Sequence, residues 1–225
     1  MSRSAFLDKG ILLGFCFTVD THHRPCLKYL TQEGIEPYIT EEIDAAFERN
    51  KSRLSTRYQE HILNHVSQLT KSNFEGEVGP MELRKIRKGL LDPGNNAFHF
   101  LEYYYREIAP NVTSVYELKN QLRDLARDIE QLSLDRKEEF DELVQEWERG
   151  GEYPDVEKAL SEIEGEDMWV CIDAHDLAVN KENETELATT DPKDMVDNGR
   201  EDLILKNTSI SKIIDLAIKP ADRWT

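Results

Sequence analysis

The hydrophobic pattern of this chain of 225 residues changes twice, and this change limits the possible folds most strongly. Near both ends, short apolar runs alternate with helical spacing, whereas the middle shows helical spacing alone. Strands that alternate with helices are typical of a parallel sheet flanked by helices. The sequence therefore predicts an α/β domain formed by residues 1–54 and 166–225, with an all-α insertion at 55–165.

The first third of the chain has two apolar runs with the character of buried strands. Residues 5–7 run into Asp8, two helical pieces follow, and a second run at 37–39 leads to Thr40. Thr40 is a good helix N-cap, and the acids that come directly after it suit the first turn of a helix. This order of strand, helix, strand and helix indicates a parallel sheet.

The last third repeats that rhythm. We expect a helix at 169–179, a strand at 187–190, a last strand at 208–210 and a closing helix at 213–217. The two outer thirds should therefore share one sheet.

The middle third contains a seam of apolar residues at alternating steps of four and three, which is typical of packed helices. The seam consists of Leu118, Leu122, Leu125, Ile129 and Leu132. It could pair with a second copy in a homodimer or pack against the other inserted helices. The second arrangement is favoured, because those helices need a partner for their own apolar faces.

The charge balance opposes a broad basic surface for nucleic acid. Lys and Arg number 28 against 45 Asp and Glu, a formal net charge of −17. At ordinary ionic strength such a surface repels phosphate backbones, but in multimolar salt the Debye length falls to about 3 Å. An origin in a salt-adapted cytoplasm is therefore one of two readings of this composition. No run reaches the roughly 20 apolar residues that a membrane span needs, so a cytoplasmic protein is expected.

Three cysteines, Cys16, Cys26 and Cys171, are widely spaced among apolar neighbours. Their spacing fits neither a disulfide framework nor a zinc site, so we expect reduced core residues.

Three acids fall where a parallel sheet binds ligands, outside the carboxyl ends of its strands. Asp8 ends the first strand, Asp191 ends the strand at 187–190, and Asp167 starts the helix before that strand. Clustered carboxylates favour a hard divalent ion, Mg²⁺ or Mn²⁺, which can activate water for phosphodiester hydrolysis. In the alternative interpretation, the acids are polar strand ends and an ordinary acid at a helix N-terminus.

Three segments resemble the PIN domain, a family of nucleases. FLDKGILLG at 6–14 is similar to its opening strand and helix, DAHDLA at 173–178 to its late helix, and LATTDPKDM at 187–195 to its late strand and turn. Together these motifs lie at the two ends of the chain. The helical middle has no counterpart in the minimal domain.

The resemblance implies a Rossmann-like parallel sheet and a ribonuclease that uses Mg²⁺ or Mn²⁺, either a toxin with an antitoxin or other protein partner or an RNA-processing enzyme. Asp8, Asp167 and Asp191 would be its metal-binding and catalytic acids. Thr189 would orient the pocket through a hydrogen bond, and Asp194 would lie near its edge.

Two positions depart from the family pattern. Ala46 stands where a Glu is usual, and Glu42, one turn earlier on the same helix face, is a candidate catalytic substitute. Lys9 replaces the usual Ser or Thr after the first acid, and its ammonium could take over part of a cation's charge. The alternative function is therefore a catalytically weakened PIN-like module that binds RNA or protein.

One dense basic patch stands out, formed by Arg84, Lys85, Arg87 and Lys88. It is the best candidate for a contact with RNA phosphates, and the alternative is a solvated helix face.

Overall fold

A computed structural model describes residues 2–72, 74–90, 101, 103–163 and 165–217 of the chain. Its strands form one five-stranded sheet in the order β3-β2-β1-β4-β5, with every neighbouring pair parallel. The strands are β1 (Arg3–Leu7), β2 (Ile35–Ile39), β3 (Gln145–Glu146), β4 (Thr185–Thr189) and β5 (Lys212–Asp215). The predicted α/β class with a parallel sheet is confirmed, and all strands end at one side, the carboxyl edge.

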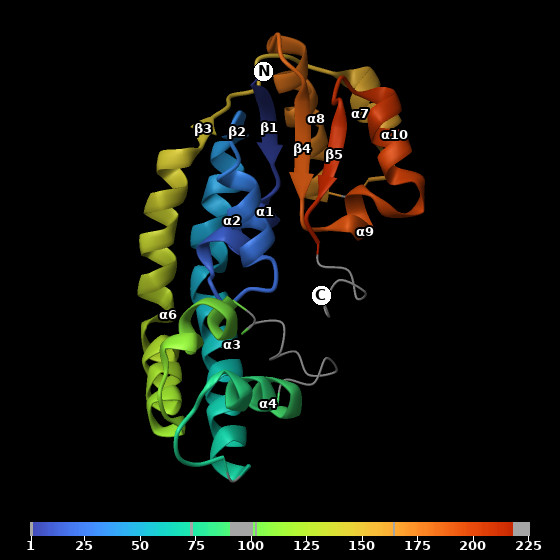
Figure 1. Ribbon diagram of the computed structural model, residues 1–225. Coiled ribbons are helices and arrows are strands. Elements are labelled where there is room, and N and C mark those ends of the chain that lie inside the picture. Colours follow the sequence, from blue (N-terminus) through green and yellow to red (C-terminus); the bar gives the residue numbers. More distant parts are fainter. Residues whose placement is uncertain (1, 73, 91–100, 102, 164, 218–225) are drawn as a thin grey trace.

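Helices cover the sheet and also extend far beyond it (Figure 1). They are α1 (Lys9–Cys16), α2 (His23–Leu30), α3 (Glu41–Lys71), α4 (Pro80–Leu90), α6 (Val115–Leu143), α7 (Pro154–Ala159), α8 (Gly165–Asn180), α9 (Pro192–Met195) and α10 (Arg200–Asn207). Short turns of other helix types are η1 (Tyr104–Ile108), η2 (Ala109–Asn111) and η3 (Asp197–Gly199).

The elements α3, α4, η1, η2 and α6 form a helical arm (Figure 1). In this arm α3 leads away from the sheet and α6 returns beside it, while α4 lies on the distal part. The seam residues Leu118, Leu122, Leu125 and Ile129 are buried within the chain, whereas Leu132, the last predicted member, is 38% exposed. The favoured prediction, packing within the insertion, agrees with this arrangement. A homodimer stays a prediction.

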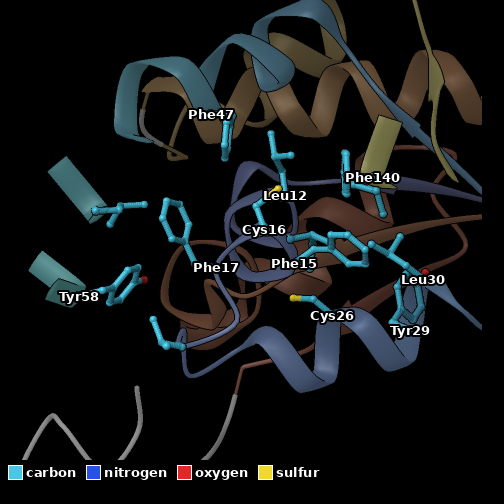
Figure 2. Close-up of a cluster of buried hydrophobic side chains, with 14 of the residues drawn as sticks. Leu12, Phe15, Cys16, Phe17, Cys26, Tyr29, Leu30, Phe47, Tyr58 and Phe140 are labelled. Carbon is cyan, nitrogen blue, oxygen red and sulfur yellow. The ribbon is translucent and has the colours of Figure 1, made fainter. Parts of the chain in front are cut away.

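The arm and the α/β part share one hydrophobic core (Figure 2). Phe15 of α1 packs against Phe140 of α6 with ring centroids 5.6 Å apart. Phe17 packs against Phe47 and Tyr58 of α3 at 6.2 and 5.2 Å. The expected boundary between residues 54 and 55 falls inside α3, because this helix runs continuously from the sheet into the arm.

A buried carboxylate fastens the chain that follows β3 to helix α8. Asp176 is fully buried, and its Oδ2 accepts hydrogen bonds from Trp147 Nε1 at 2.9 Å and Gly150 N at 3.2 Å. Its Oδ1 accepts from Gly151 N at 3.0 Å and from the Tyr153 hydroxyl at 2.7 Å. A Cβ at position 151 would lie 2.7 Å from that hydroxyl oxygen, so the close approach depends on glycine.

Two sequence predictions near the sheet edges were wrong. Residues 212–215 form strand β5 rather than a closing helix, and residues 208–210 are not a strand. Ile213 and Ile214 pair with Leu187 and Ala188 of β4, so the neighbouring strand decides the conformation of a segment whose period is ambiguous.

A third difference is β3 inside the region expected to be all helical. Its two residues pair with the end of β2, and Trp147 N donates to Ile39 O at 2.7 Å. So short a strand has no periodic signal of its own.

Among the described residues, no helix combines the length and apolar character needed to cross a membrane. All three cysteines are buried and unpaired, as expected.

Candidate functional site at the carboxyl edge

Asp8 is the most deeply placed acid of the carboxyl edge. It directly follows β1, only 2% of its surface is exposed, and the Thr189 hydroxyl donates to its Oδ2 at 3.0 Å. Its Oδ1 is buried and has no hydrogen-bond partner in the described part of the chain. Burial raises the pKa of Asp8 to about 6, and the charge of Asp167 adds to this shift. Within the described residues, this oxygen is therefore a buried acceptor without a protein donor.

The surroundings of Asp8 bring β4 and α1 very close together. A Cβ at Gly10 would lie 2.1 Å from the Thr190 hydroxyl oxygen and 3.4 Å from Asp8 Oδ2. Glycine therefore allows the first turn of α1 to approach the end of β4. The Asp191 backbone N–H donates to Thr189 Oγ1 at 2.9 Å, so the hydroxyl that binds Asp8 is itself held in place.

Asp167 lies in the first turn of α8 and is half-buried. Burial raises its pKa, Lys9 opposes this shift, and the charges of Asp194 and Asp191 raise the pKa further. The charge of Asp167 in turn raises the pKa of Asp8. The fold thus gathers Asp8, Asp167, Asp191 and Asp194 into one electrostatic neighbourhood.

The four acids of this neighbourhood differ in exposure and partners. Asp191 is exposed just before α9. Asp194 is half-buried and pairs with Arg200 Nη1 at 2.8 Å. Asp8 is therefore the enclosed member, and Asp191 is the one most open to a ligand.

Lys9 adds a positive charge among these acids. Its Nζ lies 2.8 Å from Glu166 Oε2 and 3.8 Å from Asp167 Oδ1. The Lys9 pKa is depressed by burial, but the bond to Glu166 and the charges of Asp167 and Asp8 raise it overall. The ammonium is thus held charged at the mouth of the site. The sequence placed Lys9 beside Asp8 but gave no sign of its pairing with Glu166.

Glu42 lies in the first turn of α3 and borders a small hollow beside Lys9. The hollow is lined by Glu42, Lys9, Glu166, Trp169 and Asp173. Ala46, at the position where the family has Glu, also lines it. Glu42 is exposed at the rim of this hollow.

Trp169 and Asp173, which line the hollow, both contact Arg149, and this group was not predicted. Arg149 Nε lies 2.9 Å from Asp173 Oδ1, and its guanidinium carbon lies 4.9 Å from the ring centroid of Trp169. Burial raises the pKa of Asp173 to about 6, which Arg149 partly offsets and Asp176 and Glu42 reinforce. In the sequence, the signal for this group was a tryptophan, Trp169, close to the acidic residues that start the helix.

The predicted basic patch lies on α4 in the arm, not at the carboxyl edge (Figure 1). Arg84 and Lys85 are exposed and Arg87 is half-buried. Lys88 belongs to the same helix, and its side chain lies outside the described residues. The acids and the patch are therefore separate surfaces of the molecule.

Within the described ranges, no three His, Cys, Asp or Glu side chains surround a common point closely enough to hold an ion. Mg²⁺ does not require such a cage, because it keeps several waters and is commonly held by one or two carboxylates with substrate phosphates. The Asp8 Oδ1, which has no hydrogen-bond partner among the described residues, and the nearby charge of Asp167 are compatible with that kind of site.

Comparison with models of protein families, with curated proteins and with solved structures finds no match to this chain. The resemblance to the PIN domain therefore stays a prediction based on the three sequence motifs.

Proposed function

We propose that this protein is a PIN-like ribonuclease that hydrolyses RNA phosphodiester bonds with the help of Mg²⁺ or Mn²⁺. The observation that carries the proposal is the buried Oδ1 of Asp8, which has no partner in the described chain and belongs to a carboxyl group whose pKa the charge of Asp167 raises. A buried carboxylate oxygen without a donor costs stability, and a positively charged ligand would offset that cost.

In this proposal Asp8 holds the ion, and Asp167 and Asp191 complete its surroundings directly or through waters. The ion would supply an activated water and charge stabilisation at the scissile phosphate. Thr189 fixes the Asp8 carboxylate through its hydrogen bond, so the free oxygen keeps its direction. Glu42, which lines the hollow beside Lys9 together with Glu166 and Asp173, would be the candidate to accept a proton from an attacking water.

RNA as the substrate rests on the resemblance and on the positive patch of α4. Exposed Arg84 and Lys85 suit contacts with a phosphate backbone in an otherwise acidic chain. An antitoxin or another protein partner belongs to the same proposal, since toxin ribonucleases of this family work in such pairs.

The test is cleavage of a labelled single-stranded RNA with Mn²⁺, compared among wild type, Asp8→Asn and Asp135→Asn. Asp135 is an exposed acid on α6, so its variant makes the same charge change away from the site. We expect Asp8→Asn to lose at least ~100-fold in rate, because it removes a ligand charge, and Asp135→Asn to match wild type. Equal rates in all three proteins across divalent ions and salt concentrations would rule out the ribonuclease.

A second candidate function is a binding module without catalysis, and the Lys9 ammonium favours it. Lys9 already neutralises Glu166 and stands near Asp167, which lowers the demand for a metal ion. RNA binding by fluorescence anisotropy in EDTA separates the two. Tight binding in EDTA together with no cleavage in Mn²⁺ would favour the module.

A further inference from the structure

We infer that Trp169 and Arg149 form a binding subsite for single-stranded RNA, in which the indole ring stacks on an unpaired base and the guanidinium contacts a phosphate. The inference deepens the proposed function and rests on it for the class of ligand. It concerns how RNA is held, whereas the proposed function concerns whether RNA is cut.

The indole ring of Trp169 is accessible beside the acids of the carboxyl edge. Trp169 lies on α8, 39% of its surface is exposed, and it lines the hollow together with Lys9. The Lys9 Nζ lies 3.8 Å from Asp167 Oδ1, so the hollow adjoins the acidic neighbourhood. An exposed aromatic ring suits unpaired bases, because every base has a π face that can stack on it.

The guanidinium of Arg149 is fixed against this ring. Its central carbon lies 4.9 Å from the ring centroid of Trp169, and its Nε lies 2.9 Å from Asp173 Oδ1. Only 7% of the surface of Asp173 is exposed, whereas a third of the Arg149 side chain is accessible. A buried carboxylate thus orients a cation at the surface.

The outer N–H groups of Arg149 are left for a ligand. Neither Nη nitrogen donates a hydrogen bond to any residue that the structure describes. A guanidinium that is held in place and has unused donors suits a phosphate group, which accepts two parallel hydrogen bonds from it. The ring and the guanidinium therefore match the two parts of a nucleotide.

The hollow is also less acidic than the chain as a whole, which has a net charge of −17. Three cationic side chains balance three acids there: Lys9, Arg49 and Arg149 against Glu42, Glu166 and Asp173. This local balance lowers the repulsion that a phosphate backbone meets elsewhere on the surface.

The experiment measures binding of a short fluorescein-labelled single-stranded RNA in EDTA by fluorescence anisotropy. Wild type is compared with Trp169→Ala, which removes the ring, and with Trp169→Phe, which keeps an aromatic face. The matched control is Tyr116→Ala, because Tyr116 is an aromatic residue of α6 that is 73% exposed. The duplex of the same RNA is measured in parallel, since its bases are paired and cannot stack on a side chain.

Arg149 is tested together with Asp173, because Arg149→Gln alone would leave a buried carboxylate without its cation. The double variant Arg149→Gln, Asp173→Asn removes both charges. Its control is Arg127→Gln, Asp128→Asn, which removes an exposed ion pair on α6 with the same Nε to Oδ1 distance of 2.9 Å. Circular dichroism confirms that each variant is folded.

We expect Trp169→Ala to bind the single-stranded RNA about tenfold more weakly than wild type, and Trp169→Phe to keep most of the affinity. The double variant of Arg149 and Asp173 should lose about tenfold as well. Both control variants should match wild type, and Trp169→Ala should bind the duplex as wild type does.

Three results would each overturn the inference. They are wild-type affinity for the single strand in Trp169→Ala or in the double variant, equal losses of Trp169→Ala on single strand and duplex, and absence of RNA binding by wild type.

Cleavage in Mn²⁺ keeps the two proposals apart. Binding that depends on Trp169, without any cleavage, would reject the ribonuclease and retain the subsite. Cleavage by wild type, with unchanged binding in the variants, would retain the ribonuclease and reject the subsite.

Discussion

Two buried aspartates in the same half of the molecule have opposite environments. Asp176 of α8 accepts four hydrogen bonds, two on each oxygen, from the segment at 147–153. Asp8 at the carboxyl edge accepts one from Thr189, and its other oxygen has no partner among the described residues. Both carboxylates are desolvated, but Asp176 is compensated at both oxygens, whereas Asp8 is compensated in part, by the Thr189 hydroxyl and the Lys9 backbone N–H. The difference separates a carboxylate that holds the fold together from one that is available for a ligand.

The largest effect is expected from Asp176→Asn. The amide NH₂ cannot accept hydrogen bonds, so two of the four donors lose their acceptor in a buried place. We expect a loss of about 3 kcal/mol in the free energy of unfolding, measured by urea denaturation at pH 7.5. Asp135→Asn, the exposed control, should change it by less than ~0.5 kcal/mol. A change of similar size in both variants would mean that Asp176 is not a structural anchor.

His65 extends the comparison to a buried titratable group of the helical arm. It is fully buried on α3, its Nε2 bonds the Tyr105 hydroxyl, and burial lowers its pKa to about 4. The folded chain keeps His65 neutral, while the unfolded chain takes up a proton below the ordinary value of 6.5. Its stabilising effect is therefore complete above pH 6.5 and is lost as the pH falls toward 4.

We expect wild type to lose about 2 kcal/mol more than His65→Gln between pH 7 and pH 5. The glutamine amide still reaches the Tyr105 hydroxyl but does not titrate. Urea denaturation of both proteins at the two pH values measures the difference. If wild type and His65→Gln lose the same free energy of unfolding between pH 7 and pH 5, the imidazole is protonated in the folded arm.

For Asp8 we expect a change in the free energy of unfolding of opposite sign to that expected for Asp176. Asp8→Asn removes a buried charge with one unpartnered oxygen, so we expect it to raise the free energy of unfolding by about 1–2 kcal/mol at pH 7.5. The gain should appear in thermal unfolding without metal and disappear when Mn²⁺ is added, because only wild type is stabilised by the ion. Destabilisation by Asp8→Asn in metal-free buffer would contradict the contrast between the two aspartates.

The smallest effect concerns the basic patch on the arm. The double variant Arg84→Gln, Lys85→Gln should weaken RNA binding by about 1 kcal/mol and reduce its dependence on salt. A double variant of Lys119 and Arg123 on α6 removes the same charge and serves as control. Fluorescence anisotropy over a range of salt concentrations measures both. An equal loss in the control would assign binding to overall charge rather than to α4.

Local sequence signals predicted much of the sheet and the acids around it. β1, β2 and β4 are short apolar runs that end at a polar residue, and the parallel order follows from the helices between them. Asp8, Asp167 and Asp191 could be placed at one edge for the same reason.

The missed features all depend on partners distant in sequence. β5 needs β4 as its neighbour, and β3 needs the end of β2. The pairing of Lys9 with Glu166 joins residues 157 positions apart, and Asp176 collects donors from 23 to 29 positions away. No local pattern encodes such contacts, so neither the ion pair of Lys9 nor the hydrogen bonds of Asp176 could be predicted from the sequence.

The arm leaves and rejoins the sheet at neighbouring points, where Lys137 of α6 pairs with Asp44 of α3 at 2.7 Å. Between these points, α3 with 31 residues extends over roughly 45 Å. The length of α3 therefore determines the distance between α4 and the sheet. Removing a matched pair of heptads from α3 and α6 would shorten that reach by roughly 10 Å while leaving the anchoring ends intact.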